Sequence, residues 1–496
     1  MRITNKMMTN NVLHNIGNNK QLLSKLENQY STGKKIQKPS DDPIIAVRAL
    51  KLRTSLSELT QYVEKNIPDA INWMDTTECA VTNINSILRQ MNTYCDQGAN
   101  DTLTATDRDN IITNLEELKQ QIYQEGNSNY AGRYVFTGYK TDTSLLFKEY
   151  TEQYQYTINE PLSKDDIMIS SKVVSTVDVN SFDKDNPEQY DTQVMPNVVQ
   201  TYRMRLAYSE IDENSTFSFE YKDAEGTMRT VDQSKIKKIA STDANAYTPK
   251  DDEINFIPET GELILGKDVY KQVYNAEEIQ VQYSKSKFEK NNLRPEHYFT
   301  CTRVDKNTGE TLQYKKEIQE MQYEINYNQK LTVNTQCDEV FTHDVERALD
   351  DIVKSVNDVI ETENKIKEVE KMLEDRNLTT TQKNKLEGML EQLNSEFTLR
   401  TDVMQKSFAR GLSDTAKQQD KVNEALSALG GNYNRLLLTQ GRLEDQQVEM
   451  EELLSTNEDV DLVDTIVKFT SAETVYNSSL SAASKLVQSS LLDFLR

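Results

Sequence analysis

Apolar residues near both ends of the chain recur at alternating spacings of three and four. The C-terminal stripe has polar residues at Glu473 and Ser490, and its apolar members are Leu462, Ile466, Phe469, Tyr476, Leu480, Ala483, Val487 and Phe494. The N-terminal stripe is interrupted at Asn19, and its apolar members are Val12, Ile16, Leu23, Leu26 and Tyr30. A stripe of period 3.5 is too narrow to enclose a globular core and is typical of helices that pack along other helices. The pattern predicts that these residues form an assembly interface.

The two outermost segments, 1–32 and 457–496, have no evident cover in the neighbouring sequence. The polar residues inside their stripes are of the kind that fixes the register of paired helices at a cost in stability. We therefore expect both segments to remain incompletely folded in a free subunit and to become ordered when other subunits pack on them.

Turn signals place the ends of the first helices. Gly33 follows the N-terminal stripe and suits the left-handed cap of a helix. Asp42 is predicted to cap a second helix, with Pro43 at its first position, where a missing N–H has no cost. The apolar stripe of that helix continues to Tyr94, and Pro68 predicts a kink or a short break within it.

Further helices are predicted on either side of the middle region. Thr106 and Asp109 have the spacing of a capping box and indicate the start of a third helix. A helical hairpin is predicted to begin near Phe341 and to turn at 377–380. Its second helix is long, with a break expected around Gly430-Gly431, before the C-terminal stripe.

The middle region has the period-two alternation that is typical of strands. Sixteen of the 24 tyrosines lie between residues 139 and 327, and tyrosine favours strands. The stretch 177–188 is polar and is predicted to be a loop. The predicted strands are 217–221, 254–257, 263–265, 279–283 and 323–327.

These patterns predict an α+β fold, with long antiparallel helical coiled-coil arms from both termini and a central, outward β-rich domain. The predicted parts are an N-terminal assembly helix and loop, the N-terminal half of a helical rod, a β-rich outer domain, the C-terminal half of the rod and a C-terminal assembly helix. Their ranges are 1–42, 43–140, 141–340, 341–456 and 457–496.

The composition and net charge of the chain disfavour some classes of binding partner. The chain has 496 residues, of which 36% are hydrophobic, and its mean hydropathy is −0.72, so its cores are thin relative to its surface. A net charge of −23 disfavours binding to nucleic acid or to an anionic membrane surface. Residues 1–20 lack the continuous apolar core of a cleaved signal peptide, so we expect none.

Residues that could carry chemistry are few and scattered. The four cysteines (Cys79, Cys95, Cys301 and Cys337) have no metal-ligand spacing, and neither do the three histidines. The glycines of 126–132 do not follow a strand and open a helix, as a dinucleotide site requires. We therefore predict no catalytic, cofactor-binding or metal-binding residues and no cofactor.

Several short segments resemble the flagellin superfamily, in the version found in its junction proteins between hook and filament. The prolines Pro39 and Pro43 stand where filament flagellins usually have alanine and glycine. The similar segments are Met1–Thr4, Ser31–Ile36, Pro39–Pro43, Gly126–Gly138, Gly431–Leu436 and Ser455–Asp461. The resemblance covers about 1–140 and 340–496, and it covers the middle poorly.

The resemblance implies a structural protein that is exported unfolded by the flagellar type III apparatus and assembles outside the cell at the hook–filament junction. The implied partners are further copies of the chain, a neighbouring hook-associated protein, flagellin and an export chaperone. Two alternatives remain open at this point. The chain is a subunit of the filament itself, or its central domain houses an enzyme.

Overall fold

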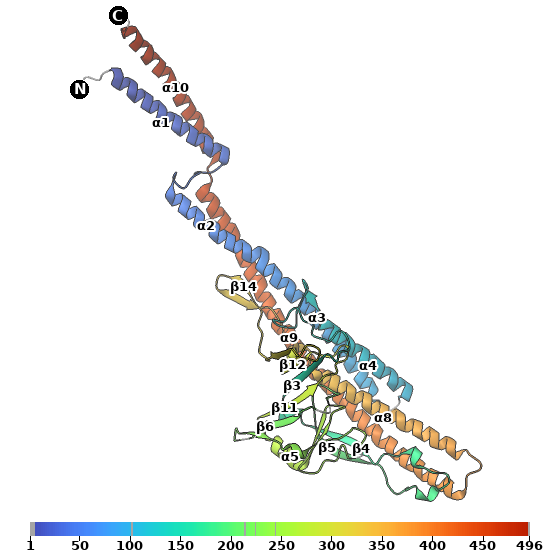
Figure 1. Cartoon of the computed structure of the whole chain (residues 1–496). Helices are drawn as coiled ribbons and strands as arrows, with labels where there is room; N and C mark the ends of the chain where they lie inside the picture. Colours follow the sequence, from blue (N-terminus) through green and yellow to red (C-terminus); the bar gives the residue numbers. More distant parts are fainter. Residues whose placement is uncertain (1–4, 101–102, 213–214, 224, 244, 495–496) are drawn as a thin grey trace. The chain divides into compact units, whose positions relative to one another are not determined.

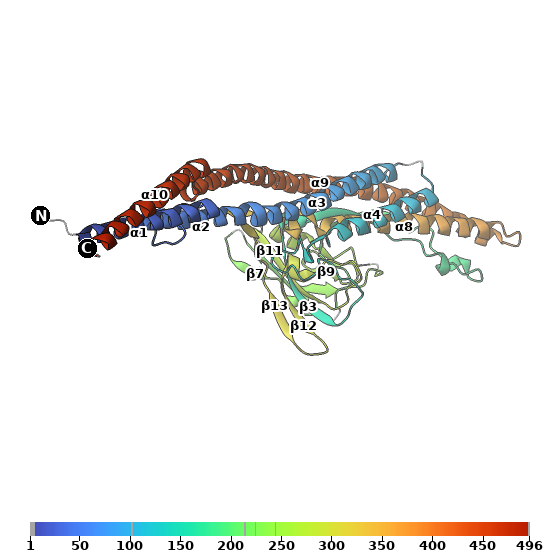
Figure 2. The same cartoon turned by 90° about the horizontal axis from the view of Figure 1, so that it is seen from above.

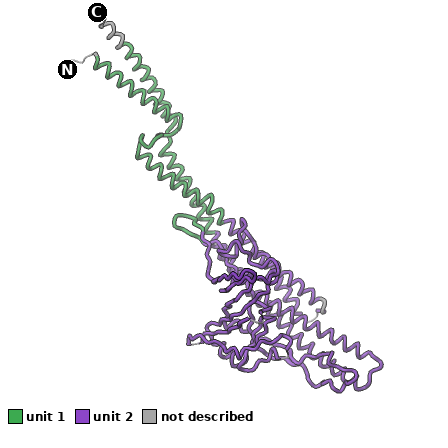
Figure 3. Tube along the Cα trace, in the orientation of Figure 1, with its two compact units in different colours: residues 1–70, 323–331, 434–496 green, residues 71–322, 332–433 purple. Residues whose placement is uncertain are grey.

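In the computed structural model, the described residues are 5–100, 103–212, 215–223, 225–243 and 245–494. Both ends of the chain form long helices and the middle forms strands, so the predicted α+β class is confirmed (Figure 1). The chain divides into two compact units, which Figure 3 colours separately. Unit 1 contains residues 1–70, 323–331 and 434–496, and unit 2 contains residues 71–322 and 332–433.

Seven long helices are found in the described part of the chain. Their bounds are α1 (Asn5–Thr32), α2 (Pro43–Gln61), α3 (Ile67–Gly98), α4 (Ala105–Glu125), α8 (His343–Leu373), α9 (Thr380–Glu458) and α10 (Leu462–Phe494). The predicted helix ends are confirmed at two places. Gly33 has a φ of +69°, and the Asp42 carboxylate accepts hydrogen bonds from the N–H groups of Ile44 and Ile45.

Of three local predictions, one is confirmed, one is displaced by two residues and one is wrong. The α-helical geometry breaks before Pro68, as predicted, because a π-helical turn, η1 (Tyr62–Asn66), precedes α3. The capping box of α4 is formed by Thr104 and Asp107, two residues earlier than the predicted pair. The expected break around Gly430-Gly431 is wrong, because α9 continues through both glycines.

Two sheets make up most of the strand structure in unit 2. The five-stranded sheet has the order β4-β5-β10-β9-β8 and the six-stranded sheet has the order β13-β12-β3-β11-β6-β7. Their strands are β3 (Tyr154–Leu162), β4 (Met168–Val174), β5 (Asn197–Arg205), β6 (Ser218–Lys222), β7 (Met228–Thr230), β8 (Ile236–Lys238), β9 (Ile254–Ile257), β10 (Glu262–Leu265), β11 (Glu278–Lys285), β12 (Thr300–Asp305) and β13 (Thr311–Tyr314).

Short elements complete the described chain. Two hairpins are formed by β1 (Asn129–Tyr130) with β2 (Arg133–Tyr134) and by β14 (Gln322–Asn326) with β15 (Gln329–Thr332). The short helices are α5 (Lys267–Val273), α6 (Pro295–Tyr298) and α7 (Cys337–Val340). Within the part of the chain that the structure describes, no helix is long and apolar enough to cross a membrane.

The two sheets share one hydrophobic core. Phe219 on β6, Phe256 on β9 and Tyr283 on β11 are fully buried in the same cluster, to which both sheets contribute. The rings of Phe217 and Phe256 stack with their centroids 4.3 Å apart. Side chains from facing sheets thus fill one layer, as in a β-sandwich.

The outer face of the five-stranded sheet meets α8 through charged groups. Arg203 on β5 is 1% exposed and donates to Glu262 on β10 (2.7 Å) and to Asp351 on α8 (2.9 Å). Arg205 donates to the Asp350 carboxylate at 2.7 Å. Burial alone would raise the pKa of Glu262, yet the Arg203 guanidinium holds it well below its usual range.

The stretch predicted as a loop, 177–188, contains two short 3₁₀ turns and no strand. Val177 and Val179 are nevertheless buried against the α8–α9 hairpin, in a cluster with Val369 and Leu386. The Val177 N–H donates to the Glu396 carboxylate at 2.7 Å. The loop is therefore anchored on the helices.

Candidate assembly interface

Helices α1 and α10 lie side by side in both views of unit 1 (Figures 1 and 2). On α1, Val12, Ile16 and Leu23 are partly covered and Leu26 is 8% exposed. The Asn19 side chain, which interrupts this stripe, donates to the Ser479 hydroxyl at 3.0 Å. The predicted N-terminal stripe therefore faces α10, and its polar position pairs with a polar partner.

On α10, the best covered residues differ from the apolar stripe. Thr465 is 4% exposed and Ala472 is 8% exposed, and both precede Ser479 at intervals of seven residues. These small side chains repeat at the heptad interval, and they allow the two helices to approach closely. Sequence reasoning missed them because it followed the large apolar residues.

The predicted interface residues of α10 fall into two groups. Phe469, Tyr476 and Ala483 are partly buried beside the small residues. Leu462, Ile466 and Leu480 are exposed by 52%, 41% and 42%. On α1, Tyr30 is 47% exposed. The side chains of Val487 and Phe494 lie outside the described residues.

Further apolar residues are exposed beside the predicted ones. Val463, Val467 and Val475 on α10 and Leu13 and Leu22 on α1 are each about half exposed or more. An apolar groove of about 410 Å³ runs along the pair, and it is lined by Asn19, Leu22, Leu26, Val467, Lys468, Ser471, Ala472 and Val475. Contiguous exposed apolar surface of this kind is typical of interaction sites.

A short elbow, residues 459–461, joins the end of α9 to the start of α10, and the loop after α1 pairs with this elbow. The Val460 N–H donates to the Gly33 carbonyl at 2.9 Å, and the Lys35 N–H donates to the Glu458 carbonyl at 2.6 Å. The Lys34 ammonium donates to the Asp459 carboxylate at 2.5 Å, which raises the pKa of Lys34 and lowers that of Asp459. Two segments that carried the sequence resemblance, 31–36 and 455–461, thus meet in space.

A buried carboxylate strengthens this elbow. The Glu458 side chain is 4% exposed and lies 2.6 Å from the Arg53 guanidinium and 3.3 Å from the Lys34 ammonium. Asn457 also donates to the Ile45 carbonyl at 3.2 Å. These contacts join α2 and the loop after α1 to the end of α9 within unit 1. The glutamate has no spacing signal in the sequence, because its partners lie more than 400 residues away.

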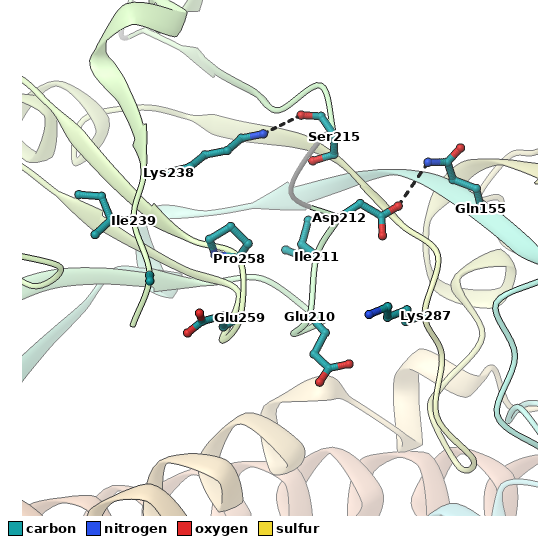
Figure 4. A pocket seen from close by; sticks show the side chains of 11 residues that line it. Gln155, Glu210, Ile211, Asp212, Ser215, Lys238, Ile239, Pro258, Glu259 and Lys287 are labelled. Carbon is teal, nitrogen blue, oxygen red and sulfur yellow. Dashed lines mark hydrogen bonds between the residues drawn. The ribbon is translucent and has the colours of Figure 1, made fainter. Parts of the chain in front are cut away.

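A cavity of about 1010 Å³ opens in the β-rich part of unit 2, and several of its polar side chains make hydrogen bonds within the chain (Figure 4). The Lys238 ammonium donates to the Ser215 carbonyl at 3.0 Å, and the Gln155 amide donates to Asp212 at 3.3 Å. Asp212 also accepts from the Ser286 hydroxyl at 2.7 Å. Among the described residues, no three His, Cys, Asp or Glu side chains are grouped to hold a metal ion.

Two of the three histidines are buried in unit 2. His343 at the start of α8 packs its ring against Tyr208 and Tyr298, with centroids 5.1 and 4.9 Å away. Burial lowers the pKa of His343 to about 3 and that of His297 to about 4. Both imidazoles are therefore neutral packing groups at neutral pH. His14 is an exposed residue on α1.

Comparison with known proteins gives the following matches. Residues 3–141 match the family model of the bacterial flagellin N-terminal helical region. The chain is 31% identical over 145 residues to flagellar hook-associated protein 3 of Salmonella typhimurium, which covers 29% of this chain and 45% of that protein. It is 33% identical over 128 residues to a flagellin of Clostridium tyrobutyricum, which covers 26% of this chain and 34% of that protein. The chain thus spans less than half the length of these relatives.

A solved structure also aligns with most of the chain. It is that of a putative flagellar hook-associated protein from Vibrio parahaemolyticus, with 13% identity and a TM-score of 0.38. The alignment covers 84% of this chain and all of that one.

Proposed function

We propose that this chain is a member of the bacterial flagellin superfamily and a structural protein of the flagellum, an adaptor at the junction between hook and filament. The observation that carries the proposal is the match of residues 3–141 to the flagellin N-terminal region together with the junction-type segments in the sequence. The pairing of 33–35 with 458–460 supports it, because the two recognised segments form one structural element.

The terminal helices assemble the protein in this proposal. They form an antiparallel coiled-coil pair, which is supported by two contacts: Asn19 pairs with Ser479, whereas the later Lys34 pairs with the earlier Asp459. One stripe of each helix is covered within the chain. The exposed side chains of Leu462, Ile466 and Leu480 supply the surface for further subunits.

The predicted interface and the five-part layout belong to the same proposal. Segments 1–42 and 457–496 serve assembly, 43–140 and 341–456 form the rod, and 141–340 is the outer domain. Burial of the exposed apolar stripes by neighbouring subunits offsets the entropy that each helix loses on ordering. A contact between unlike surfaces of successive copies then extends into a ring or helical tube.

The proposed partners follow from this place in the flagellum. They are further copies of the chain, the neighbouring hook-associated protein on the hook side and flagellin on the filament side, with a chaperone before export. The proposed route is export through the flagellar type III apparatus, and the proposed location is extracellular. The proposed role needs no cofactor and no catalysis.

A second candidate function is a subunit of the filament itself, which the 33% identity to a flagellin favours. The Pro39–Pro43 loop and the 126–138 segment favour the junction. In the structure, this second segment follows α4 and buries Val135 and Phe136, with the Phe136 ring centroid 5.0 Å from that of Phe341. This segment is therefore a well-packed connection between the helices and the strands.

A strain without this gene separates the two candidates. The junction role predicts loss of the filament, with flagellin released into the medium, and restoration of the filament by the gene supplied in trans. Immuno-electron microscopy of purified flagella should then place the protein in a short zone next to the hook. A filament that is intact or only shortened in the deletion strain, or label along its whole length, contradicts the junction role.

A further inference from the structure

A crevice of about 580 Å³ lies in unit 2 between the outer face of the five-stranded sheet and helices α8 and α9. The sheet contributes Lys172 from β4 and Arg203 from β5, and the loop before β9 contributes Tyr247. The helices contribute Lys354 from α8 and Arg410 from α9. The assembly surface described above belongs to unit 1, so this crevice is a separate feature.

Three cations in the crevice have no carboxylate partner among the described residues at ion-pair distance. The Lys172 and Lys354 ammonium groups lie 5.0 and 5.4 Å from the centroid of the Tyr247 ring. Lys354 also donates to the Tyr247 hydroxyl at 2.9 Å. Arg410 donates to the Ile169 carbonyl at 2.9 Å. Two ammonium groups thus converge on one aromatic ring.

The carboxylates of the crevice are already engaged. Asp351 binds Arg203 and Arg205, and Glu361 binds Lys365 at 2.7 Å. Asp358 lies 4.0 Å from the Arg400 guanidinium. Asp243 is exposed and accepts a hydrogen bond from the Asn245 N–H. Among the described residues that line the crevice, three cations and one carboxylate, Asp243, are without an ion-pair partner, so the excess charge is positive, in a chain that has 80 acidic and 57 basic residues.

Unpaired cations in a partly buried crevice are costly, because they lose water and repel one another. Burial lowers the pKa of Lys172; the charge of Glu262 opposes this effect, whereas Lys354 and Arg203 add to it. A bound anion would remove both costs. The crevice is also lined by serine and threonine residues, among them Ser170 and Thr176, and hydroxyl groups are able to donate to the oxygen atoms of an anion.

We propose that this crevice binds an oxyanion, a phosphate or sulfate group, between Lys172 and Lys354. A volume of about 580 Å³ is larger than a single ion needs and lies in the range of small-molecule sites. The crevice therefore has room for an organic group that carries the anion. This site is independent of the proposed assembly role.

The test uses the full chain. Calorimetric titration and thermal unfolding are followed with inorganic phosphate, with sulfate and with glycerol 3-phosphate, with sodium chloride at matched ionic strength as the reference. A saturable response and a rise in Tm beyond that in chloride are expected. The variant that combines Lys172→Met and Lys354→Met should bind at least tenfold more weakly. The control Lys271→Met removes an exposed lysine that is paired with Asp268 on α5, and should bind like the wild type.

The comparison of ligands identifies the source of the anion. Tighter binding of glycerol 3-phosphate indicates a phosphate ester, and equal binding of all three indicates a free ion. Circular dichroism checks that the double variant is folded; if it is not, the single variants Lys172→Gln and Lys172→Arg replace it, and only the arginine variant should retain binding. A wild-type response no greater than that in chloride, or unchanged affinity in the folded lysine variants, overturns the proposal.

Discussion

The α1–α10 pair and the β-sandwich bury apolar residues in opposite ways. In the sandwich, Phe219, Phe256 and Tyr283 are completely enclosed by side chains of the same chain. In the helix pair, Leu26 is buried, but Leu462 and Val463 are exposed by 52% and 73%. The sandwich satisfies its own hydrophobic pattern, whereas the helix pair covers one stripe of each helix and leaves other apolar residues exposed. Under the proposed function, the exposed stripes of the helix pair are the surface for further subunits, whereas the core of the sandwich needs no partner chain.

The polar contacts of the two regions differ in the same sense. The sheet is fixed to α8 by Arg203, which is 1% exposed and bonded to two carboxylates. Removing one member of such a buried set leaves an uncompensated charge. Next to the helix pair, by contrast, Lys34 in the loop after α1 and Asp459 before α10 form an ion pair that is about 40% exposed on both sides. Exposed ion pairs contribute only about 0–1 kcal/mol to stability.

Deletion of residues 1–32 should have the largest effect, because it removes the whole partner of α10. We expect the truncated protein to fail to join the flagellum, while unit 2 remains folded. The measurement is the fraction of cells with filaments after complementation, together with the near-ultraviolet circular dichroism of the purified protein. Normal incorporation of the truncated protein would show that this segment has no assembly role.

Replacing phenylalanine by alanine should mainly reduce stability in the sandwich and mainly reduce assembly in the helix pair. Phe256→Ala empties a fully buried site in the sandwich and should lower the free energy of unfolding by about 3–5 kcal/mol. Phe469→Ala on α10, where the ring is only partly covered, should cost about 1 kcal/mol in the isolated chain but should reduce incorporation into the flagellum. Urea unfolding and filament counts measure the two effects. Equal losses of stability at both sites would contradict the comparison.

Acid should weaken unit 2 through its buried histidines. The pKa of a histidine in an unfolded chain is about 6.5, whereas burial lowers that of His343 to about 3. The unfolded chain therefore takes up the proton first, and the stability present above pH 6.5 is lost as the pH falls toward the folded pKa. The same argument applies to His297, and each should cost about 2 kcal/mol by pH 5.

The variant His343→Phe isolates this effect, because the ring stays among aromatic neighbours and Nε2 has no hydrogen-bond partner to lose. Urea unfolding between pH 7 and pH 5 should show a smaller loss in the variant than in the wild type. Burial raises the pKa of Glu160 and of Glu346, which opposes the trend in both proteins equally. Parallel curves for the two proteins would rule out the histidine as the cause.

The smallest effect is expected in the exposed part of α9. Gly431 and Gly441 lie inside the helix, and a Cβ added at either position meets nothing within 4 Å. Gly431→Ala and Gly441→Ala should each raise the free energy of unfolding by about 0.5–1 kcal/mol, since alanine loses less backbone entropy. Thermal unfolding followed by far-ultraviolet circular dichroism measures the gain. A loss of stability would indicate that the helix needs flexibility at these positions.

Sequence periodicity was sufficient for most of the elements. Apolar residues spaced three and four apart predicted the positions of the helices. The alternation of apolar and polar residues around Phe219, Phe256 and Tyr283 predicted strands of the sandwich. Asp42 and Gly33 marked helix ends because caps depend only on local backbone geometry. The break predicted at Gly430-Gly431 was wrong. Leu429 and Leu436 are buried on either side of it, and this burial favours an unbroken helix by more than the two glycines disfavour it.

The contact between α1 and α10 was predictable from the sequence on α1 and only in part on α10. The apolar stripe of α1 faces its neighbour, but α10 presents the small residues Thr465, Ala472 and Ser479 instead of its largest side chains. A helix can carry two stripes with the same spacing, and the pattern does not say which one a given partner covers. The choice depends on how closely two particular helices approach.

By itself, the sequence determined which segments are helical, which are extended and where most of them stop, because those properties depend on neighbours a few residues away. Only the tertiary structure decided that Glu458 meets Arg53, that Arg203 meets Asp351 and that two lysines converge on Tyr247. These contacts join residues far apart in the chain. Charged side chains carry no periodic signal of their partners, so their pairing appears only once the backbone has brought them together.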